Sequence, residues 1–232
     1  MKNLQRMGGI AALYLAAAYL IGIVLFLFVL DYPSIAEPAQ KVALLVDKPM
    51  LIYLTNLLIY VIFGLFLVVL TLALYERLSA ASPAIIRTAA VIGFIWAGSL
   101  IASGMVANAG MAPVVALYGT EPAQAALAWL AIEAVANGLG GANGEILGGL
   151  LTLLVSWAAL QVSELPTGLN FLGIVIGVVG IISTVPGLSV LVGLFGMSQI
   201  VWFVWLGMVL LMKRSNPSAV VPEPGRQRSL GD

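Results

Sequence analysis

The chain has 232 residues, of which 62% are hydrophobic and only 9% charged, and its ten basic and ten acidic side chains leave no net charge. Soluble domains carry about 25% charged residues, so this chain has too few charges to cover a surface that faces water. The charge balance gives no indication of a nucleic-acid partner. Histidine and cysteine are absent from the sequence, which removes the usual ligands of zinc, copper and haem, and we expect no cofactor and no metal site.

Six segments are long and apolar enough to cross a bilayer core of about 30 Å, which takes about 20 residues of α-helix. They cover residues 8–30, 50–75, 83–107, 143–163, 168–185 and 189–212. The first segment is longer than the apolar region of a signal peptide, so we expect it to stay in the membrane. The sequence thus predicts an all-α, polytopic helix bundle, with one transmembrane domain over 1–214. The tail, 215–232, is rich in Pro, Ser and charge, and is expected to be disordered.

The basic residues predict how the chain is threaded, because Lys and Arg collect at the cytoplasmic ends of spans. With both termini in the cytoplasm, only Lys41 and Lys48 lie outside. The other eight then lie inside: Lys2, Arg6, Arg77, Arg87, Lys213, Arg214, Arg226 and Arg228. Two termini on one side require an even number of spans, and six fit. We therefore expect a multi-pass protein of the inner membrane.

A further apolar segment, 121–139, is long enough to span but is more polar than the others. Its polar residues are Glu121, Gln124, Glu133 and Asn137. The even number of spans places it on the outer side, as an interfacial or re-entrant helix, with Thr120 as its N-cap. The outer loop 31–49 has enough Val and Leu to lie along the interface as a short helix.

Small residues line one face of each of two consecutive spans. In the fifth span they are Asn170, Gly173, Gly177, Gly180 and Thr184. In the fourth span they are Glu145, Gly149, Thr152, Ser156 and Ala159. Membrane helices approach closely through small residues, so we expect a helix-packing seam that includes Gly149, Gly173, Gly177 and Gly180. The alternative, that these faces line a cavity, stays open.

The stretch "NGLGGANGEILGG", residues 137–149, places one carboxylate among glycines at the start of the fourth span. Glu145 could simply begin the helix, capped by Asn143 or Gly144, because a carboxylate in the first turn gains about 0.3–1 kcal/mol from the helix dipole. It could instead belong to an outward-facing polar cup, where a carboxylate without a basic neighbour can exchange a proton. The candidate ligand-binding residues are Glu145, Asn143, Asn108, Asn56, Asn137, Glu133 and Gln199.

Three runs of the sequence resemble a known family. They are "GGANGEILGGLLTLLVSWAALQ", "LNFLGIVIGVVGIIS" and "GMSQIVWFVWLGMVLL". The layout resembles that of the bacterial DUF4386 family, small polytopic membrane proteins of unknown function, most specifically around Glu145 and from Gln199 to Trp205. The resemblance implies a membrane location, and it implies no activity, cofactor or catalytic residue.

Two functional hypotheses follow. The first is a membrane protein that binds or passes a small molecule, a lipid or a proton through the cup. The alternative is a structural or accessory protein that acts through helix contacts with partner membrane subunits. A cavity that reaches Glu145 favours the first, and a closely packed interior with an exposed glycine face favours the second. An intramembrane enzyme is the least favoured, because the sequence has no constellation of His, Cys or paired carboxylates.

Overall fold

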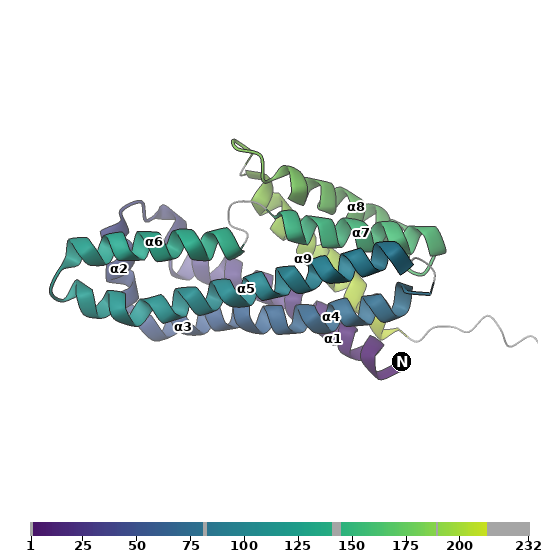
Figure 1. Ribbon diagram of the computed structural model, residues 1–232, viewed down its shortest axis with the longest axis horizontal. Coiled ribbons are helices and arrows are strands. Elements are labelled where there is room, and N and C mark those ends of the chain that lie inside the picture. Colours follow the sequence, from purple (N-terminus) through teal and green to yellow (C-terminus); the bar gives the residue numbers. More distant parts are fainter. Residues whose placement is uncertain (1, 81–82, 141–144, 189, 213–232) are drawn as a thin grey trace, which may run out of the picture.

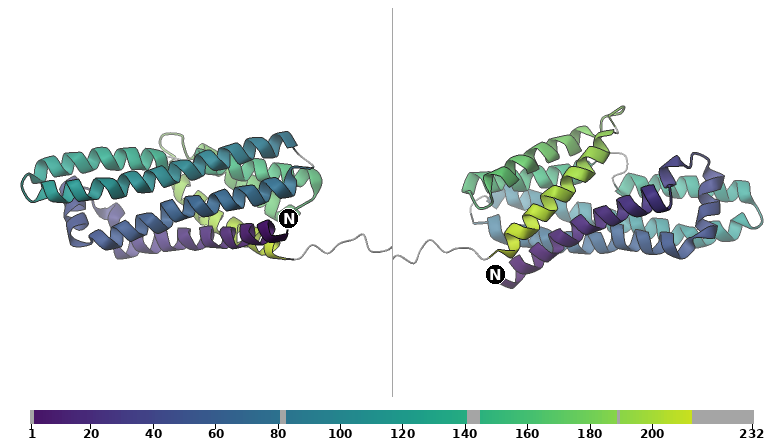
Figure 2. Two further views of the ribbon diagram at one scale, coloured as in Figure 1. Left: turned by 60° about the horizontal axis from the view of Figure 1, so that its bottom comes forward. Right: turned by 180° about the vertical axis from the view of Figure 1, so that it is seen from behind.

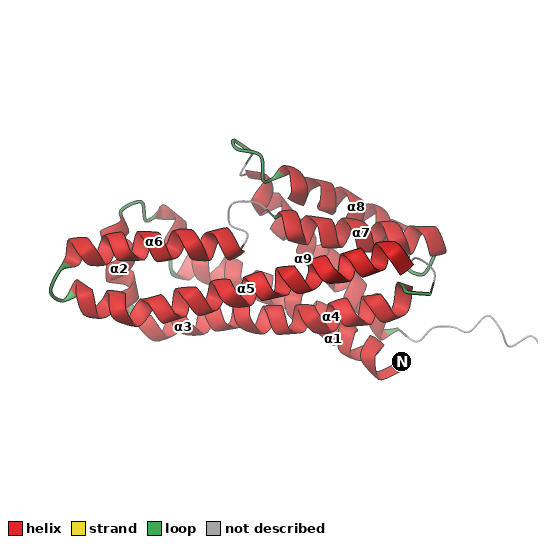
Figure 3. Cartoon of the chain, in the orientation of Figure 1, coloured by secondary structure: helices red, strands yellow, loops and turns green. Residues whose placement is uncertain are grey.

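The computed structural model describes residues 2–80, 83–140, 145–188 and 190–212. This part of the chain is helical throughout and contains no strand (Figure 3), which confirms the all-α class. The α-helices are α1 (Lys2–Ile23), α2 (Pro38–Asp47), α3 (Pro49–Asn56), α4 (Phe63–Leu78), α5 (Pro83–Tyr118), α6 (Pro122–Gly140), α7 (Ile146–Val162), α8 (Thr167–Ile182) and α9 (Val190–Leu211). Two π-helical segments and a 3-10 turn join some of them: η1 (Val24–Val29), η3 (Leu57–Ile62) and η2 (Tyr32–Ser34).

Four helical stretches are long and apolar enough to cross a membrane. They are Asn3–Val29, Pro49–Leu78, Pro83–Tyr118 and Val190–Leu211. α7 and α8 are apolar but shorter, with 17 and 16 residues. At 1.5 Å per residue they are roughly 25 Å long, slightly less than the hydrocarbon core of a bilayer. The four long helices give the chain the character of a membrane-embedded protein.

The long axis of the molecule follows α5 and the continuous stretch α3–η3–α4, which pack side by side (Figure 1). α6 folds back along the C-terminal half of α5 and, with α2, forms one end of the molecule. α7, α8 and α9 lie at the other end, where the N-terminus also lies. Each end has its own apolar core, one with Trp202 and Phe203 at its centre and the other with Leu45 and Trp129.

Helix α5 is longer than the sequence predicted. The expected span was 83–107, but the helix continues through Pro113 to Tyr118. A proline inside a helix removes one backbone hydrogen bond and disfavours its continuation. Here Met111 and Val114 are buried in the apolar core that α5 shares with α6, and this packing offsets the lost bond.

The segment 121–139 and the loop 31–49 also differ in detail from expectation. Thr120 does not cap α6, because its hydroxyl donates a hydrogen bond to the Leu117 carbonyl at 3.3 Å and so closes the end of α5. α6 begins instead at Pro122, whose fixed φ suits the first position of a helix. The 31–49 loop does contain a short helix, α2, but Val42 and Leu45 are buried. This helix packs against α6, and its apolar face is buried in the core that it shares with α6.

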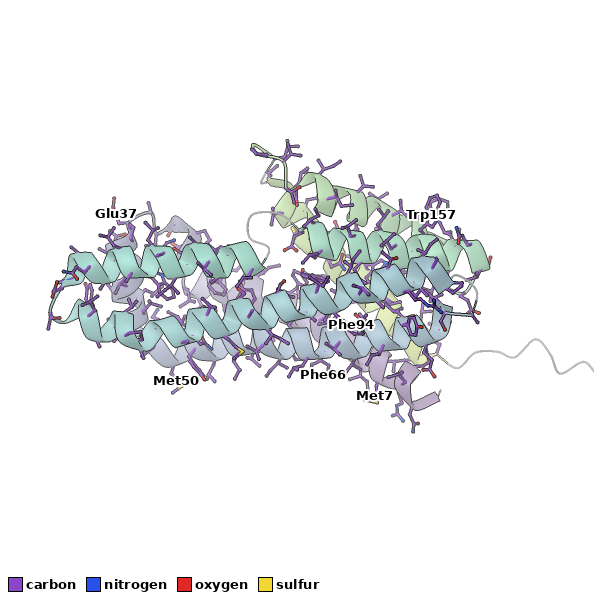
Figure 4. All side chains as sticks on the ribbon, in the orientation of Figure 1. Met7, Glu37, Met50, Phe66, Phe94 and Trp157 are labelled. Carbon is purple, nitrogen blue, oxygen red and sulfur yellow. The ribbon has the colours of Figure 1, made fainter. Side chains whose placement is uncertain are left out.

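Large apolar side chains project from the outside of the bundle on several helices. Met7, Met50, Phe94 and Trp157 all point outward (Figure 4) and are exposed by 52, 66, 39 and 52%. In water, so much exposed apolar surface would favour aggregation. Contact with lipid hydrocarbon accounts for it, in agreement with the composition.

Candidate functional site

A cavity of about 440 Å³ lies among α1, η1, η3, α4, α5 and the start of α9, and Glu145 reaches it. Its volume is within the range of small-molecule sites, roughly 300–1,000 Å³. Glu145 is the one charged side chain among the described residues that line it. Most of the other lining residues are apolar, and the aromatic ones are Tyr19, Phe26, Tyr60, Phe63 and Trp96.

Both π-helical segments contribute to the wall of this cavity. η1 supplies Phe26 and Leu27, and η3 supplies Ile59 and Tyr60. A π-helical turn is uncommon and occurs frequently at functional sites. The helices α1 and α3–α4 therefore depart from regular α-geometry where they face the cavity.

Helices α1 and α9 cross closely at one end and diverge toward the cavity (Figure 2, right view). At the crossing, a Cβ atom added to Gly9 would lie 2.7 Å from Cγ of Leu211, so the helices meet there through small residues. Further along, a Cβ atom on Gly196 would find its nearest contact at 3.5 Å, on Tyr19. Val192, at the start of α9, lines the cavity together with Tyr19, Gly22 and Ile23 of α1.

Glu145 is the N-cap residue of α7, one position before the first turn in which the sequence placed it. Its carbonyl oxygen accepts the first helical hydrogen bond from the amide of Gly149 at 2.8 Å, and its own amide donates to Oγ of Ser183 at 3.1 Å. The carboxylate makes no capping hydrogen bond to the amides of α7. Among the described residues, no basic side chain forms an ion pair with it. Helix capping therefore does not account for this carboxylate.

Asn143, a further candidate for the site, and Gly144 lie outside the described residues.

Two of the predicted asparagines, Asn56 and Asn108, are hydrogen-bonded to each other. Nδ2 of Asn56 donates a hydrogen bond to Oδ1 of Asn108 at 3.0 Å, and Nδ2 of Asn108 donates to the carbonyl of Tyr53 at 3.1 Å. These bonds join α3 to the C-terminal half of α5. Asn56 also lines a smaller cavity of about 60 Å³, together with Glu133 and Asn137.

Glu133, on α6, is contacted by Tyr32 of η2 and Lys41 of α2. Lys41 Nζ lies 2.8 Å from each of its carboxylate oxygens, and the hydroxyl of Tyr32 donates to Oε1 at 2.8 Å. The indole of Trp129 in turn donates to the Tyr32 oxygen at 3.1 Å. Burial raises the pKa of Tyr32, so its phenol remains a donor at neutral pH. Sequence reasoning missed Tyr32 and Lys41 as partners of Glu133.

The structure thus distributes the expected polar residues over two neighbouring cavities, and Tyr60 lines both. Glu145 lines the larger cavity, while Asn56, Glu133 and Asn137 line the smaller one. The aromatic residues of the larger cavity were not among the predicted site residues. Their sequence signal is weak, because an aromatic side chain in an apolar helix is also typical of core or interface positions.

Gln199 lies in the packed interior, fully buried, and lines neither of these cavities. Its Nε2 donates a hydrogen bond to Oγ1 of Thr152 at 3.0 Å. This contact joins α9 to α7. A polar side chain in an apolar bundle needs such a partner, so its contribution here is structural.

The predicted glycines lie where α7 and α8 pack together. A Cβ atom added to Gly177 would lie 2.6 Å from Cβ of Leu153 and 2.7 Å from the carbonyl oxygen of Gly149. One added to Gly180 would lie 2.8 Å from the ring of Phe195 on α9. Gly173 is also buried, with Ser156 of α7 and Trp202 of α9 as neighbours. The small face of α8 is therefore covered from within the chain.

No protein-family model matches the sequence, and neither the curated proteins nor the solved structures contain a match to it.

Proposed function

We propose that this chain is an integral membrane protein that binds a small, largely apolar molecule in the 440 Å³ cavity, with Glu145 as the polar contact. The observation that carries the proposal is the cavity itself, which reaches a carboxylate that neither caps its helix nor pairs with a described base. A concave, mostly apolar cavity of this size with a single charged group is typical of small-molecule sites. The two π-helical walls support the same assignment.

The geometry supports binding better than passage through the bundle. On the side of Phe63 the cavity meets a cluster of aromatic rings, with centroids 6.4 Å apart between Phe63 and Phe203 and 5.5 Å apart between Phe203 and Trp202. All three side chains are buried. This cluster provides a packed floor beneath the cavity, so we propose a binding site that is closed toward the inner end.

For the threading, we propose six spans, with α7 and α8 as the short pair and both termini in the cytoplasm. The N-terminus, the α4–α5 turn and the α7–α8 turn lie at one end of the molecule (Figure 1). The described basic residues Arg6, Arg77 and Arg87 belong to that end, whereas Lys41 lies on α2 at the other. This distribution follows the preference of Lys and Arg for the cytoplasmic side, and it supports a position of α6 on the outer side of the inner membrane. Membership of the DUF4386 family is part of the same proposal and adds no activity.

The alternative function, an accessory protein that docks partner subunits through a glycine face, receives less support. That hypothesis requires an exposed face of small residues. The face that contains Gly173, Gly177 and Gly180 is buried against α7 and α9. A partner subunit could not reach it without opening the bundle.

Native mass spectrometry of the purified protein tests the binding proposal. A Cβ atom on Gly22 would lie 3.6 Å from Ile59, an ordinary contact, and Gly22 lines the cavity, so Gly22→Leu fills empty space. Gly98→Leu is the matched control, because no described atom lies within 4 Å of a Cβ atom there. We expect the wild type and Gly98→Leu to retain a small molecule or a lipid, and Gly22→Leu to lose it. An equally occupied Gly22→Leu variant, or a wild type with nothing bound, would contradict the proposal.

A further inference from the structure

We infer that the cavity selects an amphiphile with a cationic head group, such as an alkyl amine or a quaternary ammonium, which enters sideways from the bilayer between α1 and α9. This inference rests on the binding function proposed above and specifies the chemical class of the ligand. It is carried by three features of the cavity: the sign of its charge, its aromatic lining and the position of its mouth.

The charge of the cavity comes from Glu145, the one carboxylate of the described lining, which includes no Lys or Arg. A carboxylate shielded from water is costly unless it is paired. An anionic ligand would be repelled by it, and a neutral ligand could donate a hydrogen bond but would leave its charge uncompensated. A cationic head group would supply the counter-charge that the described part of the chain does not provide.

The aromatic lining suits the same head group. Tyr19, Tyr60 and Trp96 line the cavity together with Glu145, and they come from three different helical segments. The faces of aromatic rings attract cations, most strongly for Trp, and aromatic cages are a common way to bind quaternary ammonium groups. A carboxylate combined with several rings therefore favours an organic cation over a small inorganic ion, which would lose its hydration shell among apolar walls.

The rest of the wall is apolar and leads to the outside of the bundle. Ile23 and Leu27 of the α1–η1 segment and Val192 of α9 line the cavity. Leu27 is itself 47% exposed, and the neighbouring Val190 at the start of α9 is 78% exposed. We therefore place the mouth of the cavity on this side, where exposed apolar side chains of both helices border it. A molecule that partitions into the bilayer could enter there with its alkyl chain along this wall and its head toward Glu145.

A binding comparison of three probes with the same chain length tests the inference. The purified protein, in nanodiscs of zwitterionic lipid, is equilibrated with radiolabelled decyltrimethylammonium, 1-decanol or decyl sulfate, and empty nanodiscs give the background. We expect the cation to bind most tightly, the alcohol less tightly and the sulfate least. Glu145→Gln should weaken binding of the cation about tenfold, or about 1.4 kcal/mol, and should leave binding of the alcohol unchanged.

Two further variants test whether the preference for the cation depends on the charge at position 145. Glu145→Asp retains the charge and should keep most of the preference for the cation, even if the position tolerates change poorly. Glu121→Gln removes an exposed carboxylate at the start of α6 and should behave as the wild type. Equal binding of cation and alcohol, or a preference that survives Glu145→Gln, would overturn the inference while leaving the binding function intact. Absence of binding for all three probes, with Gly22→Leu indistinguishable from wild type, would instead overturn the binding function.

Discussion

The ammonium group of Lys41 lies 2.8 Å from both carboxylate oxygens of Glu133, although the two residues are 92 positions apart in the chain. The contact fastens α2 to α6. Tyr32 adds a hydrogen bond to the same carboxylate, and its ring lies 4.9 Å from the ammonium group of Lys41. Lys41 is therefore held in place by protein contacts, and Glu133 stabilises the junction between α2 and α6.

This ion pair predicts a specific pattern of stability. The side chains of Lys41 and Glu133 are only 20 and 12% exposed, so Lys41→Met leaves a largely buried carboxylate without its cation. We expect a loss of about 1–3 kcal/mol in the free energy of unfolding, below the roughly 3–5 kcal/mol of a fully buried pair. The double variant with Glu133→Gln should recover part of that loss, as thermal unfolding in detergent would show. Glu121→Gln, at an exposed position just before α6, is the control. Additive losses in the double variant would mean that the pair is not coupled.

The threading predicts which introduced cysteines an impermeant reagent reaches in intact cells. Ser34→Cys and Thr120→Cys, both exposed at the outer end, should be labelled. Ala80→Cys, in the turn between α4 and α5, should be protected until the cells are lysed. Similar labelling of all three in intact cells would show that the stretch Pro49–Leu78 does not cross the membrane. The reverse pattern would show that the orientation is inverted.

The contact between α7 and α8 predicts contrasting effects at adjacent positions. Gly177→Leu should lower the free energy of unfolding by about 1–3 kcal/mol or more, because even a Cβ atom at Gly177 would lie 2.6 Å from Cβ of Leu153. Val178→Leu should change it little, since Val178 is 42% exposed. Thermal unfolding in detergent provides the comparison. Equal unfolding temperatures for the two variants would argue against close packing of these helices.

Glu145→Gln tests whether the carboxylate caps α7 through a hydrogen bond. If the carboxylate capped α7, its loss would cost about 0.5–2 kcal/mol, as N-cap substitutions do. Because the side chain makes no capping hydrogen bond, we expect the unfolding temperature to remain close to that of the wild type. A drop of several degrees in detergent would show instead that the carboxylate caps α7.

The sequence by itself determined the class of this protein. Its scarcity of charge predicts burial in a bilayer, and long apolar segments predict helices because backbone polar groups in lipid must bond within their own segment. The same reasoning placed helices in all six predicted spans and at 121–139. These properties depend on the residues within one segment, so no knowledge of its neighbours is needed. The length of α5 is an exception. This helix continues through Pro113 because it packs against α6, and the sequence of α5 alone does not reveal that contact.

Only the tertiary structure decided which polar residues meet. The sequence grouped Glu145 with Glu133 and the asparagines by their expected depth, but depth does not specify the direction in which each helix face points. Packing placed Glu133 against Lys41 and Asn56 against Asn108. It left Glu145 at a cavity with Tyr19 and Trp96, residues that local sequence cannot distinguish from ordinary core positions. α1 and α9 cross at Gly9 and diverge beyond it, and both helices contribute to the wall of that cavity. Such an angle arises from contacts between opposite ends of the chain, so it is a property of the folded bundle and of no single segment.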